Sequence, residues 1–464
     1  MKLRHGPDSI VSRPVRIWFT AGLLALLILA GILSRPLQVH EQGVFEITPP
    51  SPYFHYLPRG TERGKVLVIH GLDASKETMN LLSLGLSDAG FNVYSMDLPG
   101  HGDSKVGFNA VLATRAVASA LDQLGPETIV VGHSLGGAIL LDLANDRSFS
   151  KMVLLSPAPT PIDQIRADHV LVLVGQFDLP AILKFVPQLS LPQIELQTIP
   201  WAEHSGTVLQ PTPIRNIVSW LGGDSFSVQT GQRLFLLFVE IVCAVVLPCL
   251  WLRGKPIPSE PVHLPSRFFF YIAGSFASLW ISSVSVFDVF GLYSTGYLVR
   301  FLLVLGIALL PVYFRKLDFR LSKTLVSLLA AACVIAVAGY IGAPLAHLTL
   351  SSGRWWRFIA IGCAILPLSL ADEVILRPIR PWWKAAGTAM LTRLVIAAFV
   401  ITGVLTLNRS AAFLGLIIHF LVLFWMALWF AGELLRRNVQ NRLATALFVT
   451  VIQAWVFAAM FVLV

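Results

Sequence analysis

The second half of the chain is a series of apolar segments, each about as long as a membrane-spanning helix. They follow Gly222 and Gly223 at roughly 234–252, 268–290, 297–314, 324–343, 355–371, 386–407, 411–431 and 443–464. Most reach the ~20 residues that a helix needs to cross a bilayer. Only 13% of all residues are charged, against about 25% in soluble proteins. We therefore expect an all-α polytopic membrane domain over residues 234–464, with about eight transmembrane helices.

One more apolar segment follows a basic N-terminus that contains Lys2, Arg4, Arg13 and Arg16. Such a segment is either a cleaved signal peptide or an uncleaved anchor. Because no small-residue cleavage site follows it, we predict a transmembrane anchor over residues 17–33. The basic residues then hold residues 1–16 in the cytoplasm. Four prolines, at positions 36, 49, 50 and 52, indicate a linker over residues 34–52.

Charge is distributed as the positive-inside rule requires of a multi-pass protein of the cell membrane. With the N-terminus inside, every inner loop is basic, whereas the outer connections near 291–296, 344–354 and 408–410 contain little beyond Arg354 and Arg409. Residues 34–232 then lie outside the cytoplasm. Residues 51–222 hold 11 basic and 15 acidic side chains, although the whole chain has a net charge of +9. The basic excess therefore belongs to the membrane part, and we expect no nucleic-acid partner.

Several ionisable residues fall at or inside the apolar segments, and three of them carry specific predictions. Glu373 and Arg377 are four residues apart, which predicts an ion pair at a helix end. Arg393 lies about two turns inside its segment, so we expect its side chain to extend to the inner face of the membrane.

Residues 53–222 have the pattern of a separate globular domain. Continuous apolar runs such as K-V-L-V-I-H (65–70) alternate with stretches of helical periodicity. Such runs are typical of strands buried on both faces, and their alternation with helices predicts a mostly parallel sheet covered on both sides. All four cysteines lie elsewhere, at positions 243, 249, 333 and 363, so this domain has no disulfide.

Three ordered motifs in this domain carry chemistry. His70 and Gly71 follow the first buried strand, D-L-P-G-H-G-D-S (97–104) follows the next, and V-G-H-S-L-G-G-A (131–138) joins a strand to a helix. A lone G-x-S-x-G arises by chance in roughly 0.1–0.2 of chains this long, but the other two motifs do not accompany it by chance. Together they resemble the α/β-hydrolase superfamily, most closely its esterase, monoacylglycerol-lipase-like and S33-peptidase-like branch. The resemblance covers residues 53–222 only.

The resemblance implies a nucleophile, an oxyanion hole, an acid and a histidine. Ser134 would stand on the strand-to-helix elbow, and the backbone N–H groups of Leu135 and Leu72 would form the oxyanion hole. The superfamily order then places the acid before the histidine. Asp178 ends the strand V-L-V-L-V-G-Q-F-D (170–178), and His204 follows the last strand. Asp163 and Asp168 are poorer candidates for the acid because they precede their strand, and no other histidine follows Asp178 within the domain.

The remaining polar residues of the motifs have structural interpretations. We interpret His70, His101 and His133 as residues that order loops, because they precede the serine, and Asp97 and Asp103 as hydrogen-bonding partners of their own turn. Many relatives carry a cap domain before the strand that ends at the acid, whereas only residues 157–168 fill that place here. The resemblance therefore implies a site without a cap of its own.

These observations favour a membrane-anchored serine hydrolase that cleaves carboxylic esters, of small-molecule or lipid type, at the bilayer. Peptide cleavage and acyl transfer use the same acyl-enzyme chemistry and remain alternatives. A non-catalytic membrane protein that senses or transports a ligand is a further alternative. The chain has no metal-ligand spacing, and the mechanism needs neither a metal nor a cofactor.

Overall fold

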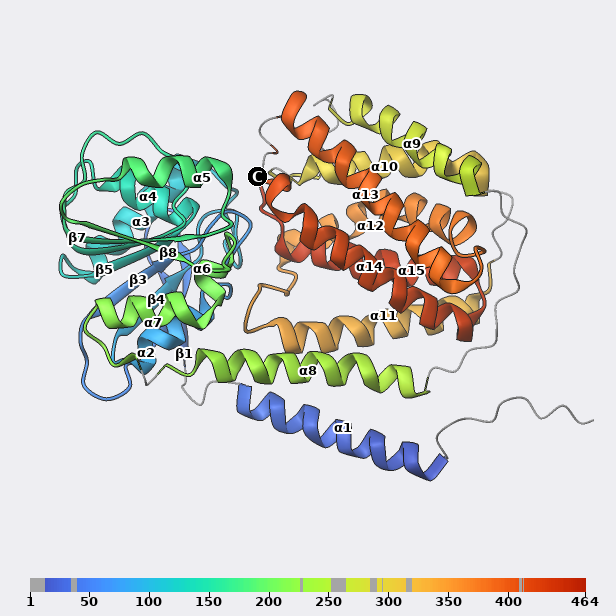
Figure 1. Ribbon diagram of the computed structural model, residues 1–464, viewed down its shortest axis with the longest axis horizontal. Coiled ribbons are helices and arrows are strands. Elements are labelled where there is room, and N and C mark those ends of the chain that lie inside the picture. Colours follow the sequence, from blue (N-terminus) through green and yellow to red (C-terminus); the bar gives the residue numbers. More distant parts are fainter. Residues whose placement is uncertain are drawn as a thin grey trace, which may run out of the picture.

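The structure is a computed structural model that describes residues 13–34, 40–225, 228–251, 264–283, 290–293, 295–313, 319–408, 411 and 413–464. An α/β domain lies at one end of a set of long helices (Figure 1). Of the predicted cytoplasmic N-terminus, residues 1–12 lie outside the described part, and the first helix, α1 (Arg13–Ser34), includes the rest. The predicted division into an α/β domain followed by a helical region is confirmed.

The α/β domain is built on one eight-stranded sheet, with strands in the order β1-β2-β4-β3-β5-β6-β7-β8. From β4 to β8 along this order, all neighbours are parallel. The strands are β1 (His40–Phe45), β2 (Ser51–Tyr56), β3 (Lys65–Ile69), β4 (Asn92–Met96), β5 (Ile129–His133), β6 (Phe149–Leu155), β7 (Ala167–Gly175) and β8 (Ile194–Ile199). The carboxyl ends of the parallel strands therefore share one edge, which we call the catalytic edge.

The prediction that residues 34–52 form a linker is wrong, because part of this stretch belongs to the sheet. The structure places β1 and the start of β2 in this stretch, and β1 pairs with β2 and β2 with β4, both antiparallel. The prolines at 49 and 50 lie between these two strands, where a turn needs no backbone donor. The sheet thus begins at His40 rather than at residue 53.

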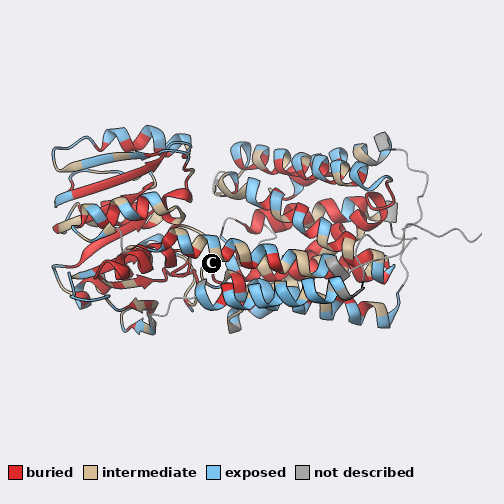
Figure 2. Cartoon of the chain, turned by 60° about the horizontal axis from the view of Figure 1, so that its bottom comes forward, coloured by how far each residue is buried: buried red, intermediate tan, exposed pale blue. Residues whose placement is uncertain are grey.

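Helices cover both faces of the sheet, as expected for a parallel sheet. Successive residues of β3 supply opposite cores: Leu67 packs on the side of α3 and α4, and Val66 packs on the side of α2 and α7. The central strands β3, β5 and β6 are mostly buried, whereas the outer strands β1 and β8 are partly exposed (Figure 2). The helices are α2 (Asn80–Asp88), α3 (Ala110–Leu124), α4 (Leu135–Leu143), α5 (Pro180–Phe185), α6 (Gly206–Leu209) and α7 (Pro211–Trp220). Between β6 and β7 the chain runs without a helix or strand, so no cap is inserted there.

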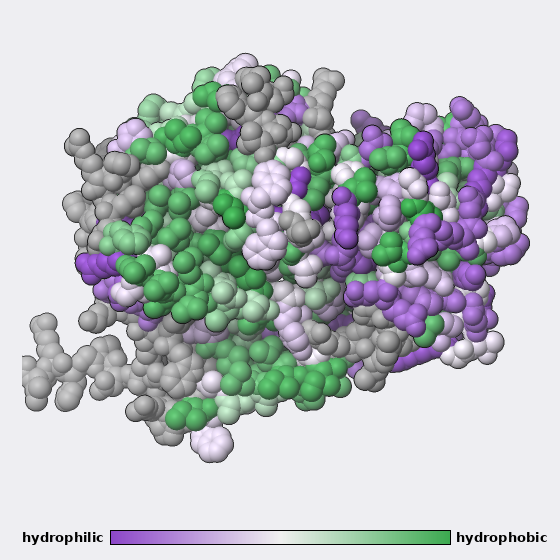
Figure 3. All heavy atoms as spheres, turned by 180° about the vertical axis from the view of Figure 1, so that it is seen from behind, coloured by the Kyte–Doolittle hydropathy of each residue, from purple (hydrophilic) through white to green (hydrophobic). Residues whose placement is uncertain are grey.

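Each predicted apolar segment of the second half contains a helix. Within the described residues, six helices are long and apolar enough to cross a membrane, as expected of a multi-pass membrane protein. These are α8 (Thr230–Trp251), α11 (Leu321–Gly342), α12 (Ser352–Ile375), α13 (Trp382–Thr406), α14 (Leu414–Val439) and α15 (Arg442–Met460). The apolar parts of α1, α9 (Leu264–Ile281) and α10 (Gly296–Tyr313) are shorter. Hydrophobic residues dominate the surface of this half, and hydrophilic ones dominate the α/β domain (Figure 3).

Several charged side chains inside the helical region are buried and paired. The predicted pair is present: Arg377 contacts Glu373, and its Nη1 also donates to Glu433 Oε2 at 2.9 Å. The prediction for Arg393 is wrong. Its guanidinium is buried against Asp372 of α12 instead of extending to the membrane face. An unpaired charge in a low-dielectric region is costly, and the Asp372 carboxylate on the neighbouring helix offsets that cost for Arg393.

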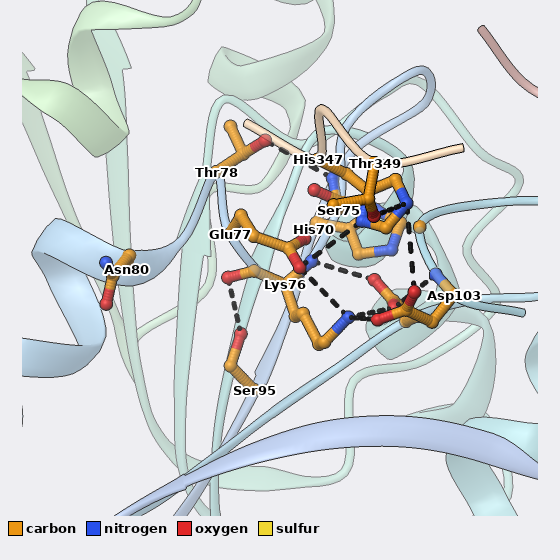
Figure 4. Close-up of polar contacts among 12 residues, drawn as sticks. His70, Ser75, Lys76, Glu77, Thr78, Asn80, Ser95, Asp103, His347 and Thr349 are labelled. Carbon is orange, nitrogen blue, oxygen red and sulfur yellow. Dashed lines mark hydrogen bonds and ion pairs between the residues drawn. The ribbon is translucent and has the colours of Figure 1, made fainter. Parts of the chain in front are cut away.

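The helical region is joined to the domain through buried charges at the catalytic edge (Figure 4). Lys76, in the loop after β3, is 1% exposed, and its Nζ lies 3.0 Å from Glu77, 2.7 Å from Asp97 and 2.6 Å from Asp103. From the loop between α11 and α12, His347 Nδ1 lies 3.4 Å from Glu77 Oε1. The Lys76 charge and the His347 contact outweigh the effect of burial, and the pKa of Glu77 lies well below its ordinary value.

A second set of contacts involves residues 462–464. Val462 N donates to Asp73 Oδ1 at 2.8 Å, and Leu463 N donates to Gly100 O at 3.0 Å. Phe108 N in turn donates to Leu463 O at 2.7 Å. We call residues 343–351 and 462–464, together with the loops 71–79 and 97–108 that they contact, the interdomain joint. Because both loops follow parallel strands, the joint turns the catalytic edge toward the helical region.

Candidate active site

Ser134 stands on a sharp turn between β5 and α4. Its backbone has φ +51° and ψ −110°, a left-handed conformation that non-glycine residues rarely adopt. The turn also requires close backbone approach: a Cβ on Gly136 would lie 2.5 Å from Ile69 O, and one on Gly132 would lie 2.6 Å from Gly136 C. Ser134 is half-buried. The motif at 131–138 therefore has the strand–turn–helix context that a nucleophile elbow needs.

Asp178 and His204 come from two neighbouring loops and meet at the catalytic edge. Asp178 lies between β7 and α5, and His204 lies between β8 and α6. The Nδ1–H of His204 donates to Asp178 Oδ1 at 2.8 Å, and both residues are buried. This bond orients the imidazole and assigns its proton to Nδ1, which leaves Nε2 free to accept a proton.

Asp178 is held as a carboxylate by several donors. Burial alone would raise its pKa, but the hydrogen bonds from His204 and Ser156 outweigh burial, and the pKa lies below its ordinary value. The donors are Ser156 Oγ to Oδ2, Gly175 N to Oδ2 at 3.3 Å and Leu179 N to Oδ1 at 2.7 Å. Sequence reasoning missed Ser156, which directly follows β6 and has φ +45°. The one feature of the sequence that could have indicated Ser156 is its position as a polar residue directly after a buried strand.

His204 lies next to the elbow. The rings of His133 and His204 are 4.8 Å apart, and His133 Nε2 donates to His204 O at 3.3 Å. Burial, with a smaller contribution from His204, lowers the pKa of His133 to about 3, so His133 is neutral. Among the described residues no hydrogen bond joins Ser134 Oγ to His204. Catalytic hydrogen bonds are often long in the absence of substrate and shorten in the reacting complex.

The two predicted oxyanion donors belong to segments next to Ser134. Leu135 is the first residue of α4, and amides in the first turn of a helix point away from it toward ligands. Leu72 belongs to the loop after β3, which passes directly beside the nucleophile: a Cβ on Gly71 would lie 3.0 Å from Ser134 Cβ. The loop that carries Leu72 is part of the interdomain joint.

His70 connects the two loops of the joint, as expected of a loop-ordering residue. Its Nδ1–H donates to Gly71 O at 2.7 Å, and its Nε2 accepts from Leu98 N at 3.0 Å. This arrangement requires the neutral ring, and burial lowers the pKa of His70 accordingly. Asp97 orders its own turn, as predicted, by accepting a hydrogen bond from the backbone N–H of Asp103 at 3.0 Å.

One cluster has the side chains to hold a metal ion. Ligand atoms of Glu77, Asp103 and His347 lie within 4.8 Å of one another. The ammonium group of Lys76 contacts both carboxylates and already supplies a compensating positive charge. This cluster therefore belongs to the interdomain joint.

Comparison with known proteins agrees with the fold of the α/β domain. Residues 66–281 match the model of the alpha/beta hydrolase family, so the recognition of that superfamily is confirmed. The matching region extends past the sheet and includes α8 and α9.

Two curated proteins match a shorter part of the chain. The magnesium-chelatase 30 kDa subunit of Rhodobacter capsulatus is 36% identical over 98 residues, 20% of this chain and 34% of that protein. The dihydrolipoyllysine-residue acetyltransferase component of the acetoin cleaving system of Cupriavidus necator is 34% identical over 108 residues, 22% of this chain and 29% of that protein. The chain thus spans about a third of the length of the curated relatives it matches.

Solved structures also match the domain. An alpha-beta serine hydrolase homologue from Coxiella burnetii is 16% identical with a TM-score of 0.34, over 40% of this chain and 98% of that one. A monoacylglycerol lipase from Paleococcus ferrophilus is 21% identical with a TM-score of 0.32, over 39% of this chain and 98% of that one.

Proposed function

We propose that the α/β-hydrolase domain of this chain is a serine hydrolase that cleaves carboxylic esters and is tethered to the cell membrane. The observation that carries the proposal is the hydrogen bond between buried Asp178 and His204, formed beside an elbow that presents Ser134. A domain that only bound a ligand would need neither the strained backbone at Ser134 nor an ionised acid directed at a histidine.

The reaction follows from these positions. Ser134 Oγ attacks the ester carbonyl carbon while His204 Nε2 takes the hydroxyl proton, and Asp178 stabilises the imidazolium that forms. The N–H groups of Leu135 and Leu72 donate to the oxygen that becomes negative, and one such donor contributes about 3–4 kcal/mol. The tetrahedral intermediate then collapses, and His204 protonates the departing alcohol. Water attacks the resulting acyl-enzyme with His204 as base, which releases the acid and restores Ser134.

We propose that the domain lies outside the cytoplasm. Residues 343–351 and 462–464 contact the domain, and the ring of Tyr293 lies 4.9 Å from that of Phe108. Tyr293 and residues 344–351 belong to connections of low basic charge, and residues 462–464 follow the last helix. One side of the helical region therefore holds the domain and these weakly basic connections. The positive-inside rule then assigns this side to the exterior.

The test uses the full chain in membranes with a panel of acyl esters, a peptide amide series and a non-water acyl acceptor. With activated esters we expect an initial burst of alcohol release, because acylation of Ser134 is then faster than hydrolysis of the acyl-enzyme, which accumulates. Faster turnover of peptide amides would reassign the domain as a peptidase, and transfer of the acyl group to the acceptor would reassign it as an acyltransferase. Turnover that Ser134→Ala leaves unchanged would contradict the proposal.

A further inference from the structure

Two large aromatic side chains are exposed beside the proposed catalytic residues. Phe177 precedes Asp178 and is 58% exposed, whereas Trp201 lies three residues before His204 and is 80% exposed. Their ring centroids are 5.9 Å apart. Isolated exposed apolar residues are ordinary on a protein surface, but two contacting aromatics at the mouth of a site form a patch with a specific location.

The exposed position of Trp201 is fixed by the backbone. Its φ of +58° is rare for a residue with a bulky side chain. Side chains hold this conformation from both sides: Gln176 Oε1 accepts from Trp201 N at 3.1 Å, and Gln210 Nε2 donates to Trp201 O at 3.3 Å. The two loops are also joined, because Phe177 N donates to Ala202 O at 2.9 Å. A strained backbone conformation such as that of Trp201 persists only where the surrounding contacts hold it in place.

The interdomain joint lies where the apolar helices end, and the two aromatics follow strands whose carboxyl ends lie at the same edge of the sheet. The candidate span of α12 begins at Gly353, just after the loop that contacts Glu77, and that of α15 ends at Met460, just before the residues that contact Asp73. The ends of β7 and β8 share the catalytic edge with those loops. In Figure 1, α6, which follows Trp201 in the chain, lies on the side of the domain turned to the helices.

We propose that Phe177 and Trp201 insert into the headgroup region of the lipid leaflet on the domain's side, and that the site takes long-chain acyl esters from that leaflet. The proposal rests on the proposed function. Aromatic side chains, tryptophan above all, concentrate at this level of a bilayer. No cap separates the patch from the catalytic residues, so an acyl chain can pass along the two rings to Ser134 while its apolar surface stays out of water.

A first experiment maps the lipid contact without using activity. The full chain is reconstituted in phosphatidylcholine vesicles that contain a phospholipid with a photoreactive diazirine near its headgroup, and cross-linked peptides are identified by mass spectrometry. We expect cross-links on the peptides that contain Phe177 and Trp201. The peptide that contains Leu57, which is 44% exposed and follows β2 at the opposite edge of the sheet, should carry none. Equal labelling of all three peptides, or none at Phe177 and Trp201, would overturn the proposal.

A second experiment measures kcat/KM for a long-chain ester within the vesicles and for an acetyl ester in solution. Trp201→Gly removes the ring and suits the left-handed backbone, Phe177→Ser removes the second ring, and Leu57→Ser is the matched control. We expect the double variant to lose roughly tenfold or more on the vesicle ester and to change less than about twofold on the acetyl ester.

The outcomes separate the two proposals. Equal loss on both esters would overturn the lipid contact and make the aromatics supports of the catalytic loops. Unchanged kinetics on the vesicle ester would overturn it as well. If the unmutated chain hydrolyses neither ester, the proposed function fails, and the cross-linking map alone decides whether the two rings meet lipid.

Discussion

The catalytic edge has two halves that differ in what covers them. At the ends of β3 and β4, the interdomain joint closes the edge with Lys76, its three carboxylates and the segments of the helical region. At the ends of β7 and β8, Phe177 and Trp201 are exposed beside Asp178 and His204. The closed half fixes how the domain contacts the helical region. Under the proposed function, the open half is where substrate reaches Ser134, and the helical region restricts access from one side only.

The largest expected effect concerns the open half. Ser134→Ala and His204→Ala should each lower kcat by several orders of magnitude, because the residues act as a unit. Asp178→Asn should lower kcat by less than either variant, because the residue that orients His204 contributes less to the rate than Ser134 or His204 itself. Circular dichroism checks that each variant stays folded. A variant of Ser134 or His204 with near-normal kcat would reject this assignment of roles.

The next effect concerns the closed half. Lys76→Met leaves three carboxylates near one another without their common cation, and removing one partner of a buried ion pair costs about 3–5 kcal/mol. Urea denaturation in detergent should show this loss in the free energy of unfolding of the α/β domain. Lys105 is exposed in loop 97–108, so Lys105→Met is the matched control and should change stability by less than about 0.5 kcal/mol. Equal stability of the two variants would mean that the joint is not held by its charges.

Acid should destabilise the domain through its buried histidines. Burial lowers the pKa of His70, His101 and His133, and that of His133 falls to about 3. The unfolded chain therefore takes up protons first as the pH falls below about 6.5, and stability is lost between that pH and the folded pKa, at up to about 1.4 kcal/mol per pH unit for each histidine. His133→Asn should reduce the slope of unfolding free energy against pH between 6.5 and 4. An unchanged slope would exclude a neutral buried His133.

The smallest effect tests the contact across the joint. His347→Ala removes one hydrogen bond to Glu77, which still pairs with Lys76, so the free energy of unfolding should fall by about 1 kcal/mol. His169, exposed on β7, is the control, and His169→Ala should have no measurable effect. If His347→Ala reduces stability as much as Lys76→Met does, then the helical region, rather than Lys76, is the main source of stability at the joint.

Sequence could predict the parts of the site in which a motif follows a buried strand. Ser134 directly follows an apolar strand, and Asp178 and His204 lie in the loops after the later strands β7 and β8. The order of these elements specifies which loops meet. The six-stranded parallel part of the sheet was predictable for the same reason. Local periodicity is enough to predict these strands and the loops after them, without knowledge of contacts between distant residues.

Other features depend on contacts between distant residues. β1 and β2 are partly polar, and they are strands because β2 pairs with β4 and β1 pairs with β2. His347 and Glu77 are 270 residues apart, and nothing near either residue indicates the other. Arg393 was expected to extend to the membrane face because its partner Asp372 belongs to a different helix. In each case the deciding interaction is tertiary, so local patterns could not predict it.

The central claim is that Ser134 is an activated nucleophile at the open half of the catalytic edge. The most direct measurement is labelling of the full chain in native membranes with a fluorophosphonate probe, followed by mass spectrometric assignment of the modified residue. The account predicts phosphonylation of Ser134, lost in Ser134→Ala and strongly slowed in His204→Ala. Folded protein that takes up no probe, or takes it up at another serine, would contradict it.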